Sequence, residues 1–445
     1  MGKQINLVLK GGVASGLVYA ELLPRLAGSF RLHGLAGASA GAIAAALGAA
    51  AEYARQSGDV SGFVRLRTAC ETLPADLPRL FQATGAFGPL LKALMYLAPG
   101  SSRPRWGQAL WTLRLPLFFL LLIGICAAER LTHGAGLSMA QVSDWLLAAL
   151  IFLVFICLGA IVYVVALLQL LTRRHFGLCS GLGSGLGTAA RPGVTDWLHT
   201  ALQSVAGTPD ILTFGDLKGR GVDLKIVATD LSRARTLMLP DTGLPLWFDP
   251  EEWRHLFPQE ILETLRPDST ATRWPLPGPD KLPVVIAVRI SLSCPGLMAQ
   301  IPVYTGPEGG HKLYLSDGGI ARNFPFDAFD GDANPCWGID FDSLRDDDDD
   351  ARRVWTLADE QSRRRTAADP LTGLFAFVWN LLFSMREADM RSRLFDETRS
   401  GRIVRIGLKR TEGGMNLHMN PTQIDRLSAC GAAAADLIIE KENAR

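Results

Sequence analysis

The chain has 445 residues, of which 48% are hydrophobic and 20% charged, and its formal net charge is +1. This length and apolar content allow two or three domains, or one large α/β domain with an insertion. The near-neutral charge excludes a strongly basic protein that would attract nucleic acid. The seven cysteines lack the spacing of a zinc site or a disulfide framework, so we expect reduced thiols.

Residues 4–56 contain two strand patterns, each followed by a helix pattern. Residues 4–9 are rich in strand-favouring side chains, and residues 17–27 have helical apolar spacing. Residues 30–36 predict a second strand, and residues 42–55 predict an alanine-rich helix. This β-α-β-α order predicts a parallel sheet with helices on its faces.

A glycine-rich segment follows the first predicted strand. In residues 11–16 (GGVASG), the backbone N–H groups of Gly11, Gly12 and Val13 would line an oxyanion hole, with Gly16 closing the turn. A phosphate-binding turn is the alternative, but the segment lacks GxGxxG spacing and no GK[ST] follows it. We therefore expect an oxyanion loop here.

A serine lies in the tight turn between the second predicted strand and its helix. The turn is GASAG, with Ser39 between Gly37 and Gly41. A nucleophile on a strand-to-helix turn exposes its hydroxyl, and the flanking glycines let chain and helix pack closely. The positive end of the following helix points at charge that develops there. Ser39 is therefore the candidate nucleophile.

Two apolar runs occupy the middle of the chain. Residues 145–171 are long enough to cross a bilayer, whereas residues 115–128 reach that length only with residues 109–113. Arginines are in excess on the outer sides of the pair (Arg103, Arg105, Arg114, Arg173 and Arg174), whereas the loop between the runs has only Arg130. This distribution favours a cytoplasmic position for the rest of the chain. The alternative is a hydrophobic lid or a re-entrant hairpin in one leaflet.

The rest of the chain continues the α/β pattern. The strand patterns lie at residues 222–231, 284–291, 336–341 and 402–408, and the helix patterns at residues 195–206, 248–257 and 424–439. Residues 177–187 are glycine-rich and predict a flexible link. Residues 346–350 are all aspartate without an EF-hand pattern, which is typical of a solvated loop. Residues 371–385 predict a core helix or one lying on a membrane surface.

A third motif, Asp317-Gly318-Gly319, lies far downstream. A serine in a tight turn, a backbone-donor loop and a distant aspartate are together the parts of a serine acyl hydrolase. With these three motifs, the chain resembles the patatin-like phospholipase family. That family pairs a glycine-rich oxyanion loop with a GxSxG serine and a later DGG or DGA aspartate.

The chain departs from the family pattern at two positions of the loop. Val13 stands where the family usually has a third consecutive glycine, and Ser15 stands where it usually has Arg or Lys. Backbone donors survive a change of side chain, so the resemblance still implies an oxyanion hole. Lys10, directly before the loop, is a candidate substitute for the missing cation.

The resemblance implies a Ser–Asp dyad that uses no metal or organic cofactor. Ser39 would attack an ester carbonyl, and Asp317 would take its proton. A Ser-Asp-His triad is the rival template. Of the seven histidines, only His418 follows Asp317, as the usual α/β-hydrolase order requires, and it lies in no catalytic motif. The sequence favours the dyad.

The resemblance also implies an α/β fold of three layers with a mainly parallel central sheet. Because Ser39 and Asp317 must share one site, the apolar runs between them must cross a bilayer an even number of times. We therefore predict an inserted transmembrane helical hairpin. The predicted divisions are residues 1–100 and 211–345 for the catalytic domain, 101–175 for the hairpin, 176–210 for a linker and helix, and 346–445 for C-terminal helices and a strand.

The predicted protein is a two-pass membrane hydrolase with its catalytic domain on the cytoplasmic side. It would cleave fatty-acyl esters of glycerophospholipids or lysophospholipids. Its expected partners are membrane lipids and a membrane, and not nucleic acid. Two alternatives stay open: a catalytically inactive patatin-like membrane scaffold, and a lipid acyltransferase.

Overall fold

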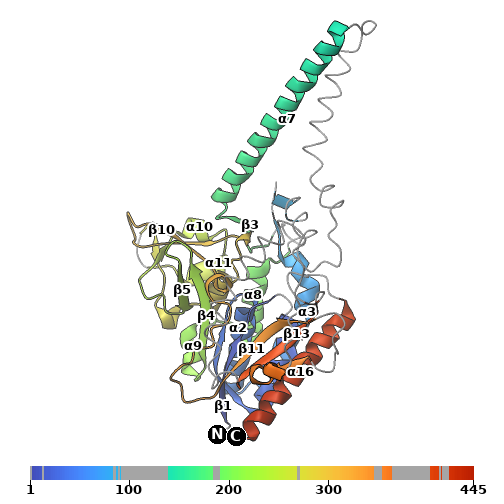
Figure 1. The fold of residues 1–445 in the computed structure, drawn as a ribbon. Helices are drawn as coiled ribbons and strands as arrows, with labels where there is room; N and C mark the ends of the chain where they lie inside the picture. The colour runs from blue at the N-terminus through green and yellow to red at the C-terminus, as the bar shows by residue number, and fades with distance from the viewer. Residues whose placement is uncertain are drawn as a thin grey trace.

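A computed structural model describes residues 3–12, 15–83, 87–88, 91, 139–183, 191–267, 271–344, 353–362, 401–409, 412 and 420–445. Helices pack against one large sheet, and helix α7 (Met139–Arg173) extends away from this body (Figure 1). The two ends of the chain lie together, where the Lys3 ammonium pairs with the Glu442 carboxylate at 3.4 Å.

Eleven of the described strands form the main sheet, in the order β12-β13-β11-β1-β2-β4-β10-β9-β6-β7, with β5 beside β4. The strands of its parallel half are β1 (Gln4–Leu9), β2 (Arg31–Gly37), β4 (Asp223–Asp230), β11 (Cys336–Ser343) and β13 (Ile403–Leu408). The others are β5 (Arg235–Leu239), β6 (Trp247–Phe248), β7 (Trp274–Pro275), β9 (Ile301–Tyr304), β10 (Lys312–Asp317) and β12 (Val354–Thr356). A separate small sheet pairs β3 (Gly177–Cys179) with β8 (Gly296–Met298).

The prediction of a mainly parallel sheet is wrong, because the sheet is mixed. The pairs β1–β2, β1–β11, β2–β4 and β11–β13 are parallel. The pairs β4–β5, β4–β10, β9–β10, β6–β9, β6–β7 and β12–β13 are antiparallel. Residues 305–311 connect β9 to β10, and residues 231–234 connect β4 to β5. Such short connections join antiparallel strands, since a parallel crossover needs a dozen residues or more.

One face of the sheet carries the large hydrophobic core. Alternate residues of β1, Ile5, Leu7 and Leu9, point to this face, because successive side chains of a strand point to opposite sides. Helices from distant parts of the chain cover them: α1 (Ser15–Ser29), α2 (Ala40–Gln56), α3 (Gly62–Leu80), α8 (Val194–Ala206) and α16 (Pro421–Asn443). The strand-helix-strand-helix order predicted for residues 4–56 is confirmed, as is the terminal helix.

The opposite face carries a smaller aromatic cluster. Val8 and Ala36 point to this side and pack with Phe324, Phe326 and Phe329 from the segment after β10. Within the described part of the chain, this face is therefore covered by residues 322–335 and the 3₁₀-helix η4 (Leu357–Ser362), and not by a matching layer of helices.

The remaining described helices are short: α9 (Phe214–Gly219), α10 (Pro250–Trp253), α11 (Gln259–Thr264), α12 (Val284–Ser291), α13 (Gly318–Ala321) and the 3₁₀-helix η2 (Pro279–Lys281). The strand predicted for residues 284–291 is wrong, since these residues form α12. Every residue of α12 is buried, and a fully buried segment has no polar face to reveal its period. Of the helix predicted at 248–257, only α10 forms.

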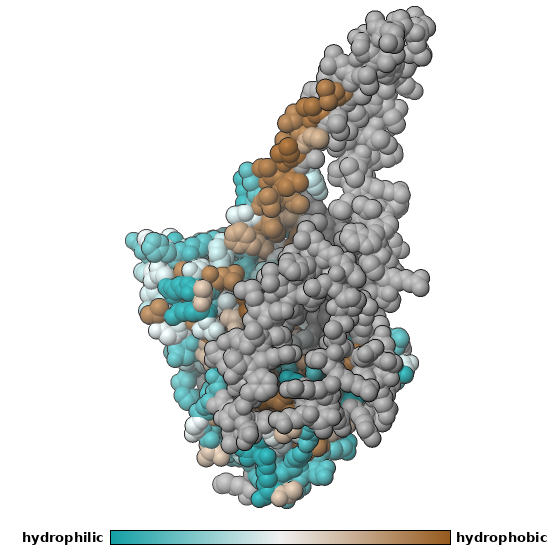
Figure 2. All heavy atoms as spheres, viewed as in Figure 1, coloured by the Kyte–Doolittle hydropathy of each residue, from teal (hydrophilic) through white to brown (hydrophobic). Residues whose placement is uncertain are grey.

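The apolar residues 145–171 lie within α7, a helix of 35 residues. Several of its side chains are exposed, and Figure 2 shows them in brown along the helix: Leu150, Val154, Leu158, Ile161, Val162, Val164, Val165 and Leu168. Even so, a search of the described residues finds no helix with the length and apolar character that a bilayer crossing requires. The predicted transmembrane hairpin at 101–175 and the two-pass membrane localisation are therefore wrong. A hairpin requires two spanning segments, and the first candidate, residues 109–128, lies outside the described residues.

Other predictions also fall outside the described residues. These concern the aspartates at 346–350 and the apolar run at 371–385. The segment predicted as a flexible link begins with β3, so its first residues belong to a small sheet. Among the described residues, no two cysteines are joined by a disulfide.

Candidate active site

The side chains of Ser39 and Asp317 meet although they are 278 residues apart in the sequence. The Ser39 hydroxyl donates a hydrogen bond to Asp317 Oδ2, with 2.9 Å between the oxygens. Ser39 lies directly before α2, and Asp317 is the last residue of β10. The carboxylate is buried, with 6% of the residue exposed. A hydroxyl paired with a buried carboxylate is the arrangement of a nucleophile with its base.

The backbone at Ser39 has the shape of a strained strand-to-helix turn. Its φ is 53° and its ψ is −130°, a conformation that an L-residue rarely adopts. Such a conformation costs about 1–3 kcal/mol and persists only where surrounding contacts enforce it. Ser39 is the N-cap of α2, so its hydroxyl lies at the positive end of a 17-residue helix.

The two glycines of the serine turn are required by close backbone packing. A Cβ at Gly37 would lie 2.3 Å from the Gly41 carbonyl oxygen. A Cβ at Gly41 would lie 2.2 Å from the carbonyl oxygen of Leu9, the last residue of β1. No side chain fits at either position, so the turn is pressed directly against the end of the first strand.

The glycine-rich loop reaches the same place. A Cβ at Gly11 would lie 2.5 Å from the Ala38 carbonyl oxygen and 2.9 Å from Ser39 Cβ. Gly12, the next residue, faces open space on its Cβ side. Val13, the third predicted oxyanion donor, lies outside the described residues. Gly16 is not sterically required, because a Cβ there would make only an ordinary 3.8 Å contact with Leu73.

The aspartate turn is fixed by two more glycines and by hydrogen bonds. A Cβ at Gly318 would lie 2.1 Å from the Val227 carbonyl oxygen of the neighbouring strand β4. The Gly319 N–H donates to Asp317 Oδ1 at 2.6 Å, which leaves Oδ2 facing the serine. The Thr229 hydroxyl of β4 donates to the Asp317 carbonyl oxygen at 2.8 Å. Asp317 is thus held through its side chain and through its main chain.

Asn323 connects the loop to the aspartate turn, and it was not among the site residues predicted from the sequence. Its side-chain amide donates to the Gly11 carbonyl oxygen at 3.4 Å. Its Oδ1 would lie 2.8 Å from a Cβ at Gly11 and 2.9 Å from a Cβ at Gly319. In the sequence, Asn323 was marked only by its position six residues after Asp317, within a stretch that resembles the family pattern.

Lys10 does not take the place of the family's loop cation. Its ammonium is buried against Asp340, with 2.6 Å between Nζ and Oδ1. Arg405 pairs with the other oxygen of that carboxylate at 2.9 Å. Burial opposes ionisation of Asp340, but Lys10 and Arg405 hold its pKa below the ordinary carboxyl value. Lys10 therefore anchors the base of the loop to the neighbouring strand β11.

Three of the described histidines make contacts with groups other than Ser39 and Asp317. His33 lies 3.1 Å from the Gly221 carbonyl oxygen, and His199 lies 3.3 Å from the Glu260 carboxylate. His175 stands beside Tyr314, and burial lowers its pKa. His418, the histidine that a triad in the usual order would need, lies outside the described residues.

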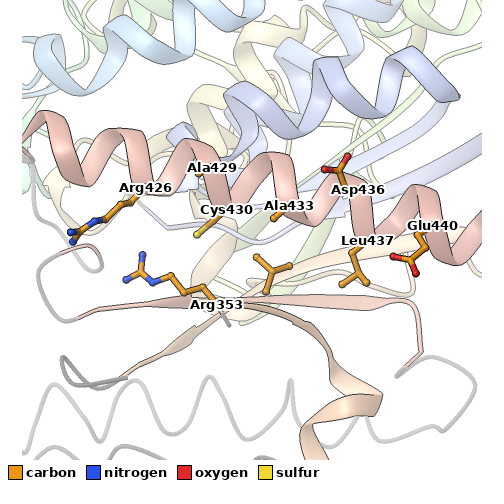
Figure 3. A pocket seen from close by; sticks show the side chains of 9 residues that line it. Arg353, Arg426, Ala429, Cys430, Ala433, Asp436, Leu437 and Glu440 are labelled. Carbon is orange, nitrogen blue, oxygen red and sulfur yellow. The ribbon is translucent and has the colours of Figure 1, made fainter. Parts of the chain in front are cut away.

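A pocket of about 540 Å³ lies elsewhere, between α16 and β12 (Figure 3). Arg353 and Arg426 line one end, and Asp436 and Glu440 line the other. β12 is at the far edge of the sheet from β10, so this pocket does not belong to the serine–aspartate site. Within the ranges described, no group of three His, Cys, Asp or Glu side chains is arranged to hold a metal ion.

The chain is similar to a known protein whose name does not describe an activity. No family model matches the chain. A protein of Rhizobium meliloti (strain 1021) named "RpoH suppressor" is 28% identical to it over 538 residues. That alignment covers 98% of this chain and 82% of the relative. The similarity therefore extends over nearly the whole chain, including the regions of Ser39 and Asp317, and the relative's name states no reaction.

Proposed function

We propose that this protein is a patatin-like serine acyl hydrolase that cleaves fatty-acyl esters of lipids with a Ser39–Asp317 dyad. The observation that carries the proposal is the 2.9 Å hydrogen bond between Ser39 Oγ and Asp317 Oδ2, made at a strained turn. Backbone strain of this kind collects at functional sites, where surrounding contacts maintain it.

In the proposed reaction, Asp317 accepts the proton of the Ser39 hydroxyl as Oγ attacks the ester carbonyl carbon. The carbonyl oxygen takes up negative charge, and the N–H groups of the loop at Gly11, Gly12 and Val13 bind it together with the positive end of α2. The intermediate collapses, the alcohol leaves with the proton, and an acyl-serine forms. Asp317 then takes a proton from water, which attacks the acyl-serine, and returns it to Ser39 Oγ as the acyl–Oγ bond breaks and the fatty acid leaves.

An acyl-lipid substrate is supported by exposed apolar side chains on the segments that lead into and out of the Asp317 turn and its neighbouring strand. Ile320 follows the Asp317-Gly318-Gly319 turn directly, and 40% of it is exposed. Leu231, at the end of β4, is 42% exposed, and its backbone N–H bonds to the Tyr314 carbonyl oxygen of β10. Exposed apolar side chains on the segments that carry the aspartate suit an ester whose acyl part is a hydrocarbon chain.

The test is incubation of the full-length protein with a mixture of phospholipids, lysophospholipids and neutral acyl lipids, followed by mass spectrometry. The wild type should release free fatty acid. Ser39→Ala and Asp317→Asn should each lose at least about 10³-fold in rate, because members of a catalytic unit act together. The circular dichroism spectra and unfolding midpoints of both variants should stay close to those of the wild type. Retained hydrolysis in either folded variant would remove that residue from the mechanism.

A further inference from the structure

The C-terminal turn of α12 contacts both members of the dyad. This turn, residues 289–293, begins in the last helical residues and ends just beyond the helix. It lies against the start of α2 on one side and the end of β10 on the other. The side chains of Arg289, Ser291 and Ser293 are completely buried there.

Ser291 holds the backbone of the nucleophile. The Ser39 N–H donates to the Ser291 hydroxyl oxygen, with 2.9 Å between N and O. The N–H at an N-cap has no partner inside its helix, so a side chain must satisfy it. Loss of this acceptor would leave a buried donor unpaired beside a backbone that already carries strain.

Ser293 holds the backbone of the aspartate. The Asp317 N–H donates to the Ser293 carbonyl oxygen at 3.1 Å. The hydroxyl of Ser316, the preceding residue, donates to the same carbonyl oxygen at 3.0 Å. Two residues of one turn therefore set the distance between the main chains of Ser39 and Asp317.

Arg289 locks this turn. Its guanidinium donates to Ser293 Oγ at 2.6 Å, to the Ser180 carbonyl oxygen at 2.8 Å and to the Ala299 carbonyl oxygen at 3.1 Å. The Ser293 hydroxyl in turn donates to the Arg289 carbonyl oxygen at 3.1 Å. Burial lowers the pKa of Arg289 to about 9. All three acceptors are neutral, so the charge is buried at a cost that an apolar residue would avoid.

We infer that Arg289 and Ser291 are positioning residues that hold Ser39 and Asp317 at reacting distance through the α12 turn. This inference rests on the proposed function, because it assigns the two residues a part in that reaction. Neither residue touches the substrate in this account. Arg289 holds the turn in its conformation. Ser291 binds the main chain of Ser39, and Ser293 binds the main chain of Asp317.

The test compares Ser291→Ala and Arg289→Lys with the matched control Thr356→Val in the full-length protein. Thr356, the last residue of the edge strand β12, is also completely buried, and its hydroxyl donates to Asp359 of η4, away from the dyad. Ser291→Ala should lower kcat about 10- to 100-fold with little change in KM, because small displacements of reacting groups cost rates of that order. The kcat of Arg289→Lys should lie between those of Ser291→Ala and the wild type, since an ammonium cannot reach all three acceptors at once. Thr356→Val should keep the wild-type kcat, although its unfolding midpoint should fall by about as much as that of Ser291→Ala.

Amide hydrogen exchange gives a readout that does not depend on activity. Peptides spanning residues 37–43 should exchange faster in Ser291→Ala than in the wild type, and they should be unchanged in Thr356→Val. Unchanged exchange with unchanged kcat in Ser291→Ala would overturn the inference, as would a kcat loss of the same size in Thr356→Val. If the wild type hydrolyses no acyl ester but exchange behaves as expected, the proposed function fails while the structural restraint stands.

Discussion

Backbone packing predominates around Ser39 and hydrogen bonds predominate around Asp317, although the Ser39 N–H also bonds to Ser291 and Gly318 also packs on the backbone of β4. Ser39 belongs to the parallel half of the sheet, where Gly11, Gly37 and Gly41 allow backbone to lie against backbone with no room for a side chain. Asp317 ends an antiparallel strand, where several hydrogen bonds fix its main chain and carboxylate. The nucleophile side should therefore be sensitive to added atoms, and the aspartate side to lost hydrogen bonds.

The difference follows from the topology around each residue. β1 and β2 are parallel neighbours, so their carboxyl ends meet at one edge of the sheet and bring the glycine loop onto the serine turn. β10 is antiparallel to β4, so Asp317 comes from a strand that runs the opposite way. Polar contacts from β4 and α12 then orient the aspartate at that edge.

The largest effect is expected from an added methyl group on the nucleophile side. In Gly41→Ala, the new Cβ would lie 2.2 Å from the Leu9 carbonyl oxygen, which is backbone and cannot move aside easily. Overpacking of this kind costs about 1–3 kcal/mol or more, and the turn should shift enough to reduce hydrolysis at least about 100-fold. Chemical unfolding and fatty-acid release measure the two effects.

Gly28→Ala is the matched control for that change. Gly28 lies in α1, is exposed and faces open space, so an added Cβ meets nothing within 4 Å. Alanine should stabilise the helix slightly, by up to about 1 kcal/mol, and leave the hydrolysis rate unchanged. If Gly41→Ala behaved like Gly28→Ala, close packing would not be what positions the nucleophile.

A smaller effect is expected from a lost hydrogen bond on the aspartate side. Thr229→Val removes the hydroxyl that donates to the Asp317 carbonyl oxygen and accepts from the Ala321 N–H. We expect a loss of about 1–2 kcal/mol in unfolding free energy and a roughly tenfold lower rate. Thr229→Ser keeps the hydroxyl and should retain most of the activity. Equal rates in the two variants would show that this contact does not orient the aspartate.

The same contrast explains what the sequence could reveal. The parallel half was predictable because alternating strand and helix patterns in residues 4–56 have clear periods and glycine boundaries. The importance of the glycines at 11, 37 and 41 was also predictable, because a turn that packs against backbone leaves no room for a side chain at these positions. Ser39 and Asp317 were identified because their motifs stand in these turns.

The antiparallel half was much harder to predict. Strands such as β6, β7 and β9 are too short to show alternation, and α12 is buried on every side, so it was mistaken for a strand. Asn323, Ser291 and Arg289 act through contacts between distant segments, which no local pattern reports. The transmembrane prediction failed for a related reason, because hydropathy alone did not determine what the apolar run at 145–171 does.

Covalent labelling by a fluorophosphonate probe is the most direct test of whether Ser39 is a nucleophile activated by Asp317. The full-length wild type, Ser39→Ala and Asp317→Asn would be reacted with the probe and digested, and the adduct would be located by peptide mass spectrometry. We expect an adduct on Ser39 in the wild type, none in Ser39→Ala, and a labelling rate at least about 100-fold lower in Asp317→Asn. A folded wild type that forms no adduct at Ser39, or that reacts no faster than Asp317→Asn, would contradict the proposed Ser39–Asp317 dyad.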